Sequence, residues 1–460
     1  MPYKGERASK GGHTDIVKNP DVASFLQECE YMKVPSEEEG KEIAELYNEI
    51  ELSETLPDKI IASDASTYSE PIDNNFPSTQ IGYVKVSLVL IEINNYNGLY
   101  LDNRFVDPFK VAQLHKNSDA IAFTLPGSNI QYKGESSVAN GFRRAIYEQF
   151  CSQNTQFSKT GDYNIKGTLY YLDRIMDEPL LEVHKCPSCG YNEETFSFDA
   201  NEVVKCPNCK ENIYFTDSLR LHEQISDFGN STSAITRFMN VTEHLLMATL
   251  IRMMADNYPE ALSKMAFMID GPLAIFGQPA RVHARLMKFY FDVRQKIHSM
   301  NLSAPIIVGL QKTGQLAEHA EAISRYLEPK TFKLVDDTYR SKYIVGFEKS
   351  SENFGHETYY GQDFIFKSAS GKVFVVGIPY PFSKKNTKKD FAKQKANVDA
   401  YKDILSRTFK LIQHFEFELY ENAVVPIALA HRHASISLVP GGKVLDMLSK
   451  NGLIKENGCI

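Results

Sequence analysis

The stretch KMAFMIDGPLAIFG, residues 264–277, places five consecutive apolar residues directly before Asp270 and follows it at once with glycine and proline. An apolar run of this length, bounded by turn residues, is typical of a buried strand. Aspartate and glycine are common in turns, so one interpretation of Asp270 is a turn residue. It is explained equally well as a metal-binding acid at the open end of a buried sheet. The second interpretation requires further acids elsewhere in the chain.

The overall composition is that of a soluble globular protein. The chain has 460 residues, of which 43% are hydrophobic and 24% charged, and its formal net charge is −7. This length can bury a large core and predicts more than one structural unit. No apolar run is long enough to span a membrane, and the polar first twenty residues hold no apolar signal core, so we expect a cytoplasmic protein. If nucleic acid is the ligand, local basic patches and bound cations must attract it.

The order of expected elements indicates an α/β fold. After a polar leader, a helix is expected over 35–52, with a capping-box pattern of Ser36 and Glu39 near its start. A short strand ending at Asp64 and a long strand over 81–95 then pair antiparallel. The segment 139–150 is expected to be helical and 167–173 extended. From residue 234, helices alternate with strands, which predicts parallel pairing; the helices are expected at 234–256, 279–298, 315–327, 400–415 and 426–437, and the strands at 265–269, 304–311 and 372–382.

An antiparallel start, a helix and then alternating strands and helices resemble a ribonuclease H-like mixed sheet with flanking helices and inserted material. The clearest insertion is KCPSCGYNEETFSFDANEVVKCPNCK, residues 185–210. Two C-x2-C pairs separated by sixteen residues can direct four thiolates at one cation. They predict a structural zinc ribbon, with TFSF and VV forming a small β-hairpin. The four expected zinc ligands are Cys186, Cys189, Cys206 and Cys209.

A pair of redox C-x-x-C motifs is the alternative interpretation of the same cysteines. The other three cysteines are scattered, which does not suggest a disulfide framework and fits a reducing compartment. They are Cys29, Cys151 and Cys459.

Three acids form a candidate metal site. Asp64 ends the apolar run KIIAS just as Asp270 ends MAFMI. A third acid, Glu243, has apolar helical neighbours at i−4, i+3 and i+4, so its carboxylate lies on the apolar face of its helix. That position is costly unless the carboxylate is paired, for example with Arg237, or binds a metal. Carboxylates are hard oxygen ligands suited to Mg²⁺ or Mn²⁺.

Histidine and lysine residues supply further candidates. His431 lies on an expected helix in VVPIALAHRHASIS, residues 424–437, and is either a hydrogen-bonded core residue, a fourth ligand or a proton carrier. His433 points elsewhere on that helix. Lys312 follows a strand in VGLQKTG and either reaches a phosphate or is solvated. The loop 383–395 carries six lysines that either track phosphates or form a solvated face: Lys384, Lys385, Lys388, Lys389, Lys393 and Lys395.

Five short motifs, in this order, resemble those of the NurA nucleases, and together they span about residues 58–440. They are IASDAS (61–66), TEHLL (242–246), MIDGPL (268–273), VGLQKTG (308–314) and ALAHRHASI (428–436). The resemblance implies a metal-dependent DNA nuclease with an RNase H-like fold that acts with the hexameric HerA ATPase in DNA end processing, repair or defence against foreign DNA. It also implies a homodimer. Asp64, Glu243 and Asp270 would be the Mn²⁺ or Mg²⁺ ligands, and His431 the active-site histidine.

The sequence departs from the family pattern at two places. Ala65 stands where the family usually has the glycine of Asp-Gly-Ser, and Ala423-Val424 stand where it usually has Tyr-Pro. The zinc ribbon is an insertion relative to the short members. The resemblance implies a leader and helical segment at 1–57, a nuclease core in two parts at 58–182 and 218–440 around a ribbon at 183–217, and a tail at 441–460.

Two other function classes remain open from the sequence. One is a non-catalytic adaptor that uses a degenerate RNase H-like core, the ribbon and the lysine loop to bind DNA or a protein. The other is a zinc-ribbon protein with an unrelated α/β enzyme core. The presence of all three acids favours the nuclease over the adaptor.

Overall fold

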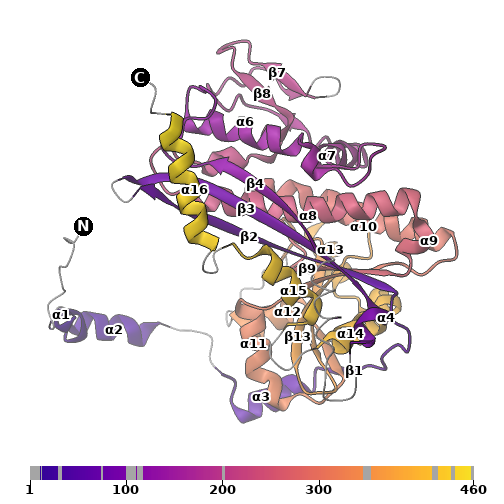
Figure 1. Ribbon diagram of the computed structural model, residues 1–460. Helices are drawn as coiled ribbons and strands as arrows, with labels where there is room; N and C mark the ends of the chain where they lie inside the picture. The colour runs from indigo at the N-terminus through magenta and orange to yellow at the C-terminus, as the bar shows by residue number, and fades with distance from the viewer. Residues whose placement is uncertain are drawn as a thin grey trace.

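The computed structural model describes residues 11, 13–29, 34–73, 76–99, 110, 118–198, 202–345, 354–416, 423–436 and 441–456. Cys459 lies outside these ranges. A nine-stranded mixed sheet runs through the described part of the chain, and helices cover both of its faces (Figure 1). No described helix is long and apolar enough to cross a lipid bilayer.

The strands of the large sheet lie in the order β1-β11-β12-β13-β10-β9-β2-β3-β4. Among these described strands, β2 with β9 and β9 with β10 pair parallel, and all other neighbours pair antiparallel. The bounds are β1 Asn48–Glu49, β2 Lys59–Asp73, β3 Phe76–Glu92, β4 Ser118–Pro126, β9 Met265–Asp270, β10 Ile306–Gln311, β11 Thr331–Leu334, β12 Gly361–Lys367 and β13 Val373–Pro379.

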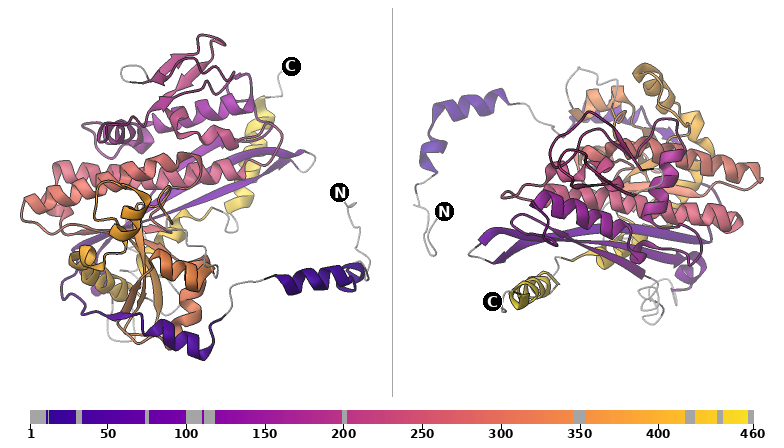
Figure 2. Two further views of the ribbon diagram at one scale, coloured as in Figure 1. Left: turned by 180° about the vertical axis from the view of Figure 1, so that it is seen from behind. Right: turned by 90° about the horizontal axis from the view of Figure 1, so that it is seen from above.

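Two helical layers enclose the sheet (Figure 2). Helices α6, α7, α8 and α10 pack on one face, and α4, α14 and α15 pack on the other. Helices α1 and α2 bury no residue and lie away from the body (Figure 1). The helices are α1 Thr14–Val17, α2 Pro20–Glu28, α3 Glu37–Ala44, α4 Ile93–Asn97, α6 Val138–Phe150, α7 Ile165–Arg174, α8 Thr232–Asn257, α9 Pro259–Leu262, α10 Val282–Ser299, α11 Gln315–Ile323, α12 Asp337–Tyr339, α13 Lys388–Lys395, α14 Lys402–Phe415, α15 Val425–Ala434 and α16 Gly441–Glu456.

The half of the sheet in the order β4-β3-β2-β9-β10 confirms the predicted ribonuclease H-like arrangement. An antiparallel meander, β2-β3-β4, comes first, and helix α8 then leads to β9, which pairs parallel with β2. Helix α10 connects β9 to its parallel neighbour β10. The later strand β13 was also expected, but it pairs antiparallel with β10.

Several expected boundaries were wrong. The strand expected to end at Asp64 continues through it, because the long β3 supplies antiparallel partners as far as Asp73. The segment 167–173 is helical within α7, where its apolar residues Leu169 and Leu172 pack into the core. The helix expected over 35–52 begins with the predicted capping box but ends at Ala44, before strand β1.

The turn after Asp270 is explained by its glycine and its leucine. Gly271 has a φ of 107°, which favours glycine, and its N–H donates to the Leu310 carbonyl at 2.8 Å. A Cβ on Gly309 would lie 2.5 Å from the Gly271 carbonyl oxygen, so the neighbouring strand must have glycine at this point. The chain then places the fully buried Leu273 over Gly309 and Gly361. The DGPL motif therefore anchors the turn onto the sheet and leaves Asp270 at the carboxyl end of β9.

Candidate functional site

Asp64 and Asp270 are neighbours because their strands are parallel and in register. The last paired residues of β2 and β9 are Ser63 and Ile269, so Asp64 and Asp270 come one position later on adjacent strands. Asp270 is the last residue of β9, whereas Asp64 lies in the interior of β2. The side chain of Asp64 is only 8% exposed, and its Oδ1 accepts the Ala65 N–H at 2.8 Å.

Helix α15 brings His431 onto the same face of the sheet. Its Ile427 and Ala430 are buried against the core, and the Ser66 hydroxyl in β2 donates to the Ala434 carbonyl at the end of the helix. This packing places Nδ1 of His431 2.7 Å from Oδ2 of Asp64. One ligand atom from each of Asp64, Asp270 and His431 lies within 4.8 Å of the other two. The structure thus brings together three of the four residues expected at the catalytic site.

Lys312 supplies the positive charge at this cluster. It follows directly after β10, the strand next to β9, and its Nζ lies 2.6 Å from Oδ2 of Asp270. Burial raises the pKa of Asp270 to about 6; the Lys312 ammonium opposes this rise and the neighbouring Asp64 carboxylate adds to it. The lysine therefore offsets only part of the cost of holding two carboxylates together.

Glu243 lies beside the cluster but is not among the three residues with converging ligand atoms. Ser63 and Asp64 are consecutive in a strand and point to opposite faces of the sheet. The Ser63 hydroxyl donates to Oε1 of Glu243 on α8 at 2.7 Å, while Asp64 faces His431 on α15. Burial raises the pKa of Glu243 well above its ordinary value, the Asp64 carboxylate adds to this rise, and the Ser63 hydrogen bond opposes it.

The ion pair considered for Glu243 is not found among the described residues. Arg237 lies instead against Gly277, where a Cβ would approach its Nε to 2.7 Å. Glu243 is 5% exposed and its hydrogen bond within the described structure comes from a neutral hydroxyl. Its burial beside two other acids is therefore not compensated by an ion pair.

Two serines at the site were missed in the sequence. Ser63 donates to Glu243, and Ser87 pairs directly across from Asp64 on β3, so it shares the Asp64 face. Ser87 is fully buried and its hydroxyl has no hydrogen-bond partner in the described structure. The signal for Ser87 was a single hydroxyl within the apolar strand VKVSLVLI, residues 84–91.

The donor set of the cluster fits a divalent cation. Two carboxylates and one imidazole converge, and carboxylate oxygens are the ligands preferred by Mg²⁺ and Mn²⁺. Burial is the main cause of the raised pKa of Asp270, and repulsion from the Asp64 carboxylate adds to it. A bound cation would relieve that repulsion.

The four ribbon cysteines form a second, separate cluster. All four Sγ atoms lie within 4.8 Å of one another, and the pairs Cys186–Cys209 and Cys189–Cys206 are each 3.7 Å apart. Thiolates about 2.3 Å from one zinc ion at the corners of a tetrahedron would be separated by about 3.8 Å. All four are free thiols, so no disulfide competes for them. The geometry fits a closed, structural zinc site.

The expected single hairpin of the ribbon is replaced by two. Strand β6 (Phe196–Ser197), within TFSF, pairs antiparallel with β5 (Glu182–Val183), which precedes the first cysteine. Strand β7 (Val203–Lys205), which contains VV, pairs antiparallel with β8 (Asn212–Tyr214), and the second cysteine pair lies in the turn between them. Each short sheet thus belongs to one cysteine pair.

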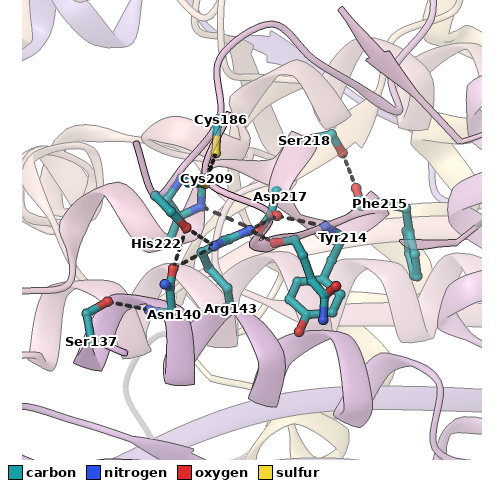
Figure 3. A network of polar contacts seen from close by, with 12 residues as sticks. Ser137, Asn140, Arg143, Cys186, Cys209, Tyr214, Phe215, Asp217, Ser218 and His222 are labelled. Carbon is teal, nitrogen blue, oxygen red and sulfur yellow. Dashed lines mark hydrogen bonds and ion pairs between the residues drawn. The ribbon is translucent and has the colours of Figure 1, made fainter. Parts of the chain in front are cut away.

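A buried arginine fixes the ribbon to helix α6 (Figure 3). Arg143 donates to both carboxylate oxygens of Asp217, at 2.9 and 2.6 Å, and to the Asn212 carbonyl at 2.6 Å. It also donates to Ser188, which lies between the first two cysteines, at 3.0 Å. The Arg143 and Asp217 side chains are 2% and 1% exposed. Such a bidentate, desolvated pair holds the ribbon in a defined orientation.

The lysine-rich segment is partly helical; among its lysines Lys395 is buried and Lys385 is partly buried. Lys385 donates to the carbonyls of Gly355, His356 and Tyr359, and burial lowers its pKa to about 7. Lys395 forms an ion pair with Asp337 at 2.5 Å. The Lys385 ammonium is therefore occupied by backbone carbonyls of the protein, and its contact with DNA stays a prediction. The exposed lysines of the segment are Lys384, Lys388, Lys389 and Lys393.

No protein-family model matches the chain, and no curated protein is similar to its sequence. Two solved structures are similar in arrangement. One is the NurA nuclease from Sulfolobus solfataricus, with 10% identity and a TM-score of 0.37 over 98% of this chain and 100% of that chain. The other is also described as NurA, with 10% identity and a TM-score of 0.27 over 96% and 97% of the two chains. Both belong to the family that the sequence motifs resemble.

Proposed function

We propose that this protein is a divalent-metal-dependent deoxyribonuclease whose active site is the cluster of Asp64, Asp270 and His431. The observation that carries the proposal is the convergence of their ligand atoms within 4.8 Å on one face of the sheet, beside the carboxyl end of β9. The buried Glu243 and the cationic Lys312 lie next to that cluster. Three acids, a histidine and a lysine in one place provide the groups that metal-assisted phosphodiester hydrolysis requires.

The acids would hold Mn²⁺ or Mg²⁺. We propose that the three acids hold two ions. Asp64 and Asp270 are the ligands with converging oxygens, and Glu243 is the third acid, beside them. When bound, such ions polarise a phosphoryl oxygen and lower the pKa of coordinated water. The protein contributes a nearly buried, rigid pair of carboxylates whose spacing is fixed by the β2–β9 register.

His431 is the residue placed to hold a proton. Because a carboxylate only accepts hydrogen bonds, Nδ1 of His431 donates to Asp64, and Nε2 of the neutral ring keeps its lone pair. The His431 side chain is 59% exposed, so a substrate can reach it. An imidazole fixed at one nitrogen and open at the other suits proton transfer at the attacking or leaving oxygen.

Positive charge that could attract a phosphate-containing substrate is present only in local groups, not in the protein as a whole. The chain carries a net charge of −7, so bound metal, Lys312 and the exposed lysines of 384–393 would have to provide the attraction for DNA. A protein with so few basic groups at its site is poorly equipped to hold long DNA unaided.

The motif resemblance extends the proposal to assembly. We propose a homodimer that receives DNA from a HerA-type hexameric ATPase, in end processing, repair or defence against foreign DNA. Co-expression with the HerA-like ATPase of the same organism should give a complex that co-elutes and digests DNA faster with ATP. Separate elution of the two proteins, with no effect of ATP, would reject this partner.

The activity itself is tested with purified full-length protein on linear and circular DNA, in Mn²⁺, Mg²⁺ and EDTA. Cleavage that needs metal and is lost in Asp270→Asn supports the nuclease. Binding of DNA without cleavage in any metal would favour the non-catalytic adaptor.

A further inference from the structure

The ammonium of Lys312 pairs with a carboxylate that a bound metal would need. Its Nζ lies 2.6 Å from Oδ2 of Asp270, whose carboxylate is one of the three converging ligands. The two side chains are 24% and 14% exposed, so water screens this contact only in part. Lys312 thus neutralises part of the acid cluster from within the site.

A divalent cation and this ammonium cannot both hold Asp270 closely without repelling each other. Like charges a few ångströms apart in a partly buried site interact strongly. The metal carries two charges and gains the Asp64 carboxylate as a second ligand, whereas the ion-pair partner of Lys312 among the described residues is Asp270. Metal binding should therefore displace the ammonium from Asp270.

The lysine can move although its backbone is anchored. Its neighbour Gln311 donates to Oδ1 of the buried Asp363 at 2.7 Å, and Arg340 donates to the other oxygen of Asp363 at 2.9 Å. This interaction fixes the end of β10. The flexible four-carbon stem of Lys312 then allows its ammonium to swing while its Cα stays in place.

We propose that Lys312 is an exchangeable counter-ion: it pairs with Asp270 without metal, and on metal binding it is released to a DNA phosphate beside the cluster. The inference rests on the proposed nuclease function and assigns Lys312 the coupling between metal and substrate. Lys312 competes with metal, and metal in turn makes Lys312 available to DNA. Each ligand thereby changes the affinity of the site for the other.

The test compares Lys312→Met with Lys288→Met in the full-length protein, at about pH 8 so that Asp270 is ionised. Lys288 is a matched control, because its side chain is 23% exposed and pairs with Asp292 on α10, apart from the acid cluster. Lys312→Arg retains the positive charge and controls for any effect of substitution at this position on folding. Calorimetry measures Mn²⁺ affinity without DNA, and a gel-shift assay measures binding of a short duplex in Ca²⁺ or in EDTA.

Lys312→Met should bind Mn²⁺ about tenfold more tightly than wild type, because the competing cation is gone. It should bind the duplex about tenfold more weakly in Ca²⁺ and equally well in EDTA, where Lys312 is held by Asp270. Lys288→Met should behave as wild type in both assays, and Lys312→Arg, which keeps the positive charge, should not gain the Mn²⁺ affinity that Lys312→Met gains. Unchanged or weaker Mn²⁺ binding by Lys312→Met would overturn the exchange.

The two proposals fail in different ways. Tighter Mn²⁺ binding by Lys312→Met in a protein that cuts no DNA would support the exchange and reject the nuclease. Metal-dependent cleavage by wild type, with equal Mn²⁺ affinity in wild type and Lys312→Met, would support the nuclease and reject the exchange.

Discussion

Nδ1 of His431 lies 2.7 Å from Oδ2 of Asp64, although 367 residues separate them in sequence. The pair forms because α15 packs on the face of β2 to which Asp64 points. It links helix α15, late in the chain, to strand β2, early in the chain. The contact gives His431 a defined tautomer and an open nitrogen at the acid cluster.

Replacing His431 by alanine should lower the rate of DNA cleavage about a hundredfold or more, as expected for loss of a general acid or base. His433→Ala is the matched control, since its Nδ1 faces Ser118 in β4 at 3.3 Å and not the acids. Initial rates in saturating Mn²⁺ measure both variants, and circular dichroism checks their folding. Equal rates for the two variants would show that His431 only packs against Asp64.

Stability without metal should depend on the pH through Asp270. Its pKa is raised from 3.8 to about 6, so the folded state holds a proton that the unfolded state releases. Relative to Asp270→Asn, the wild-type free energy of unfolding in EDTA should therefore fall as the pH rises from about 4 to about 6, by up to about 3 kcal/mol, and stay level above that range. Urea unfolding at several pH values measures this difference. A difference that grows with pH would contradict the burial of Asp270 beside the Asp64 carboxylate.

Metal affinity should show the opposite dependence on pH. Carboxylates bind metal when deprotonated, so Mn²⁺ affinity should rise between about pH 5 and 7 as Asp270 loses its proton. Titration calorimetry over this range measures the affinity, with Asp270→Asn as the variant that should show little binding. An affinity independent of pH would exclude Asp270 as a ligand.

The ribbon should hold one zinc ion per chain. Cys189→Ser should lose the metal and lower the melting temperature, because closed thiolate sites couple zinc binding to local folding. Cys151→Ser is the control: this thiol lies outside the cluster, near Glu202, and its loss should leave the zinc content unchanged. Elemental analysis and a thiol assay measure both. Absence of zinc, or a disulfide within either cysteine pair, would refute the site.

The exposed lysines of the 384–393 segment should contribute to DNA binding. Replacing Lys384, Lys388 and Lys389 together by glutamine should weaken binding of DNA of any sequence. The salt slope, which is the slope of the logarithm of the binding constant against the logarithm of the salt concentration, should fall by about one for each phosphate that is no longer neutralised. Lys385→Met should instead destabilise the fold, since three carbonyls lose their donor, and leave the salt slope unchanged. An unchanged slope in the triple variant would identify the segment as a solvated surface.

The sequence was sufficient to predict the order of the central elements, because apolar periodicity distinguishes α8 and α10 from β9 and β10. It also predicted Asp64, Asp270 and His431 as members of one site, and the structure brings them together. The length of β2 was not predictable, since its outer half is polar and is specified by pairing with β3. Segment 167–173 was misassigned because its aromatic residues favour strands, whereas packing against α8 holds it as a helix.

Other features depend on tertiary contacts that no local pattern reveals. Glu243 was recognised as a buried acid, but its orientation toward Ser63 follows from which face of β2 meets α8. Lys385 and Lys388 lie in the same lysine-rich run, yet one is enclosed by backbone carbonyls and the other is exposed. Neither distinction can be read from residue type or spacing.

The most direct test of the account is a comparison of wild type and Asp270→Asn by thermal melting with and without Mn²⁺, beside a cleavage assay. If the acids converge on metal, the variant should melt in EDTA at the same temperature as wild type or higher, because one repelling charge is gone. It should lose cleavage and most of the stabilisation that Mn²⁺ gives the wild-type protein. An Asp270→Asn protein that melts much earlier in EDTA yet still cuts DNA would show that Asp270 is a structural turn residue and contradict the proposed site.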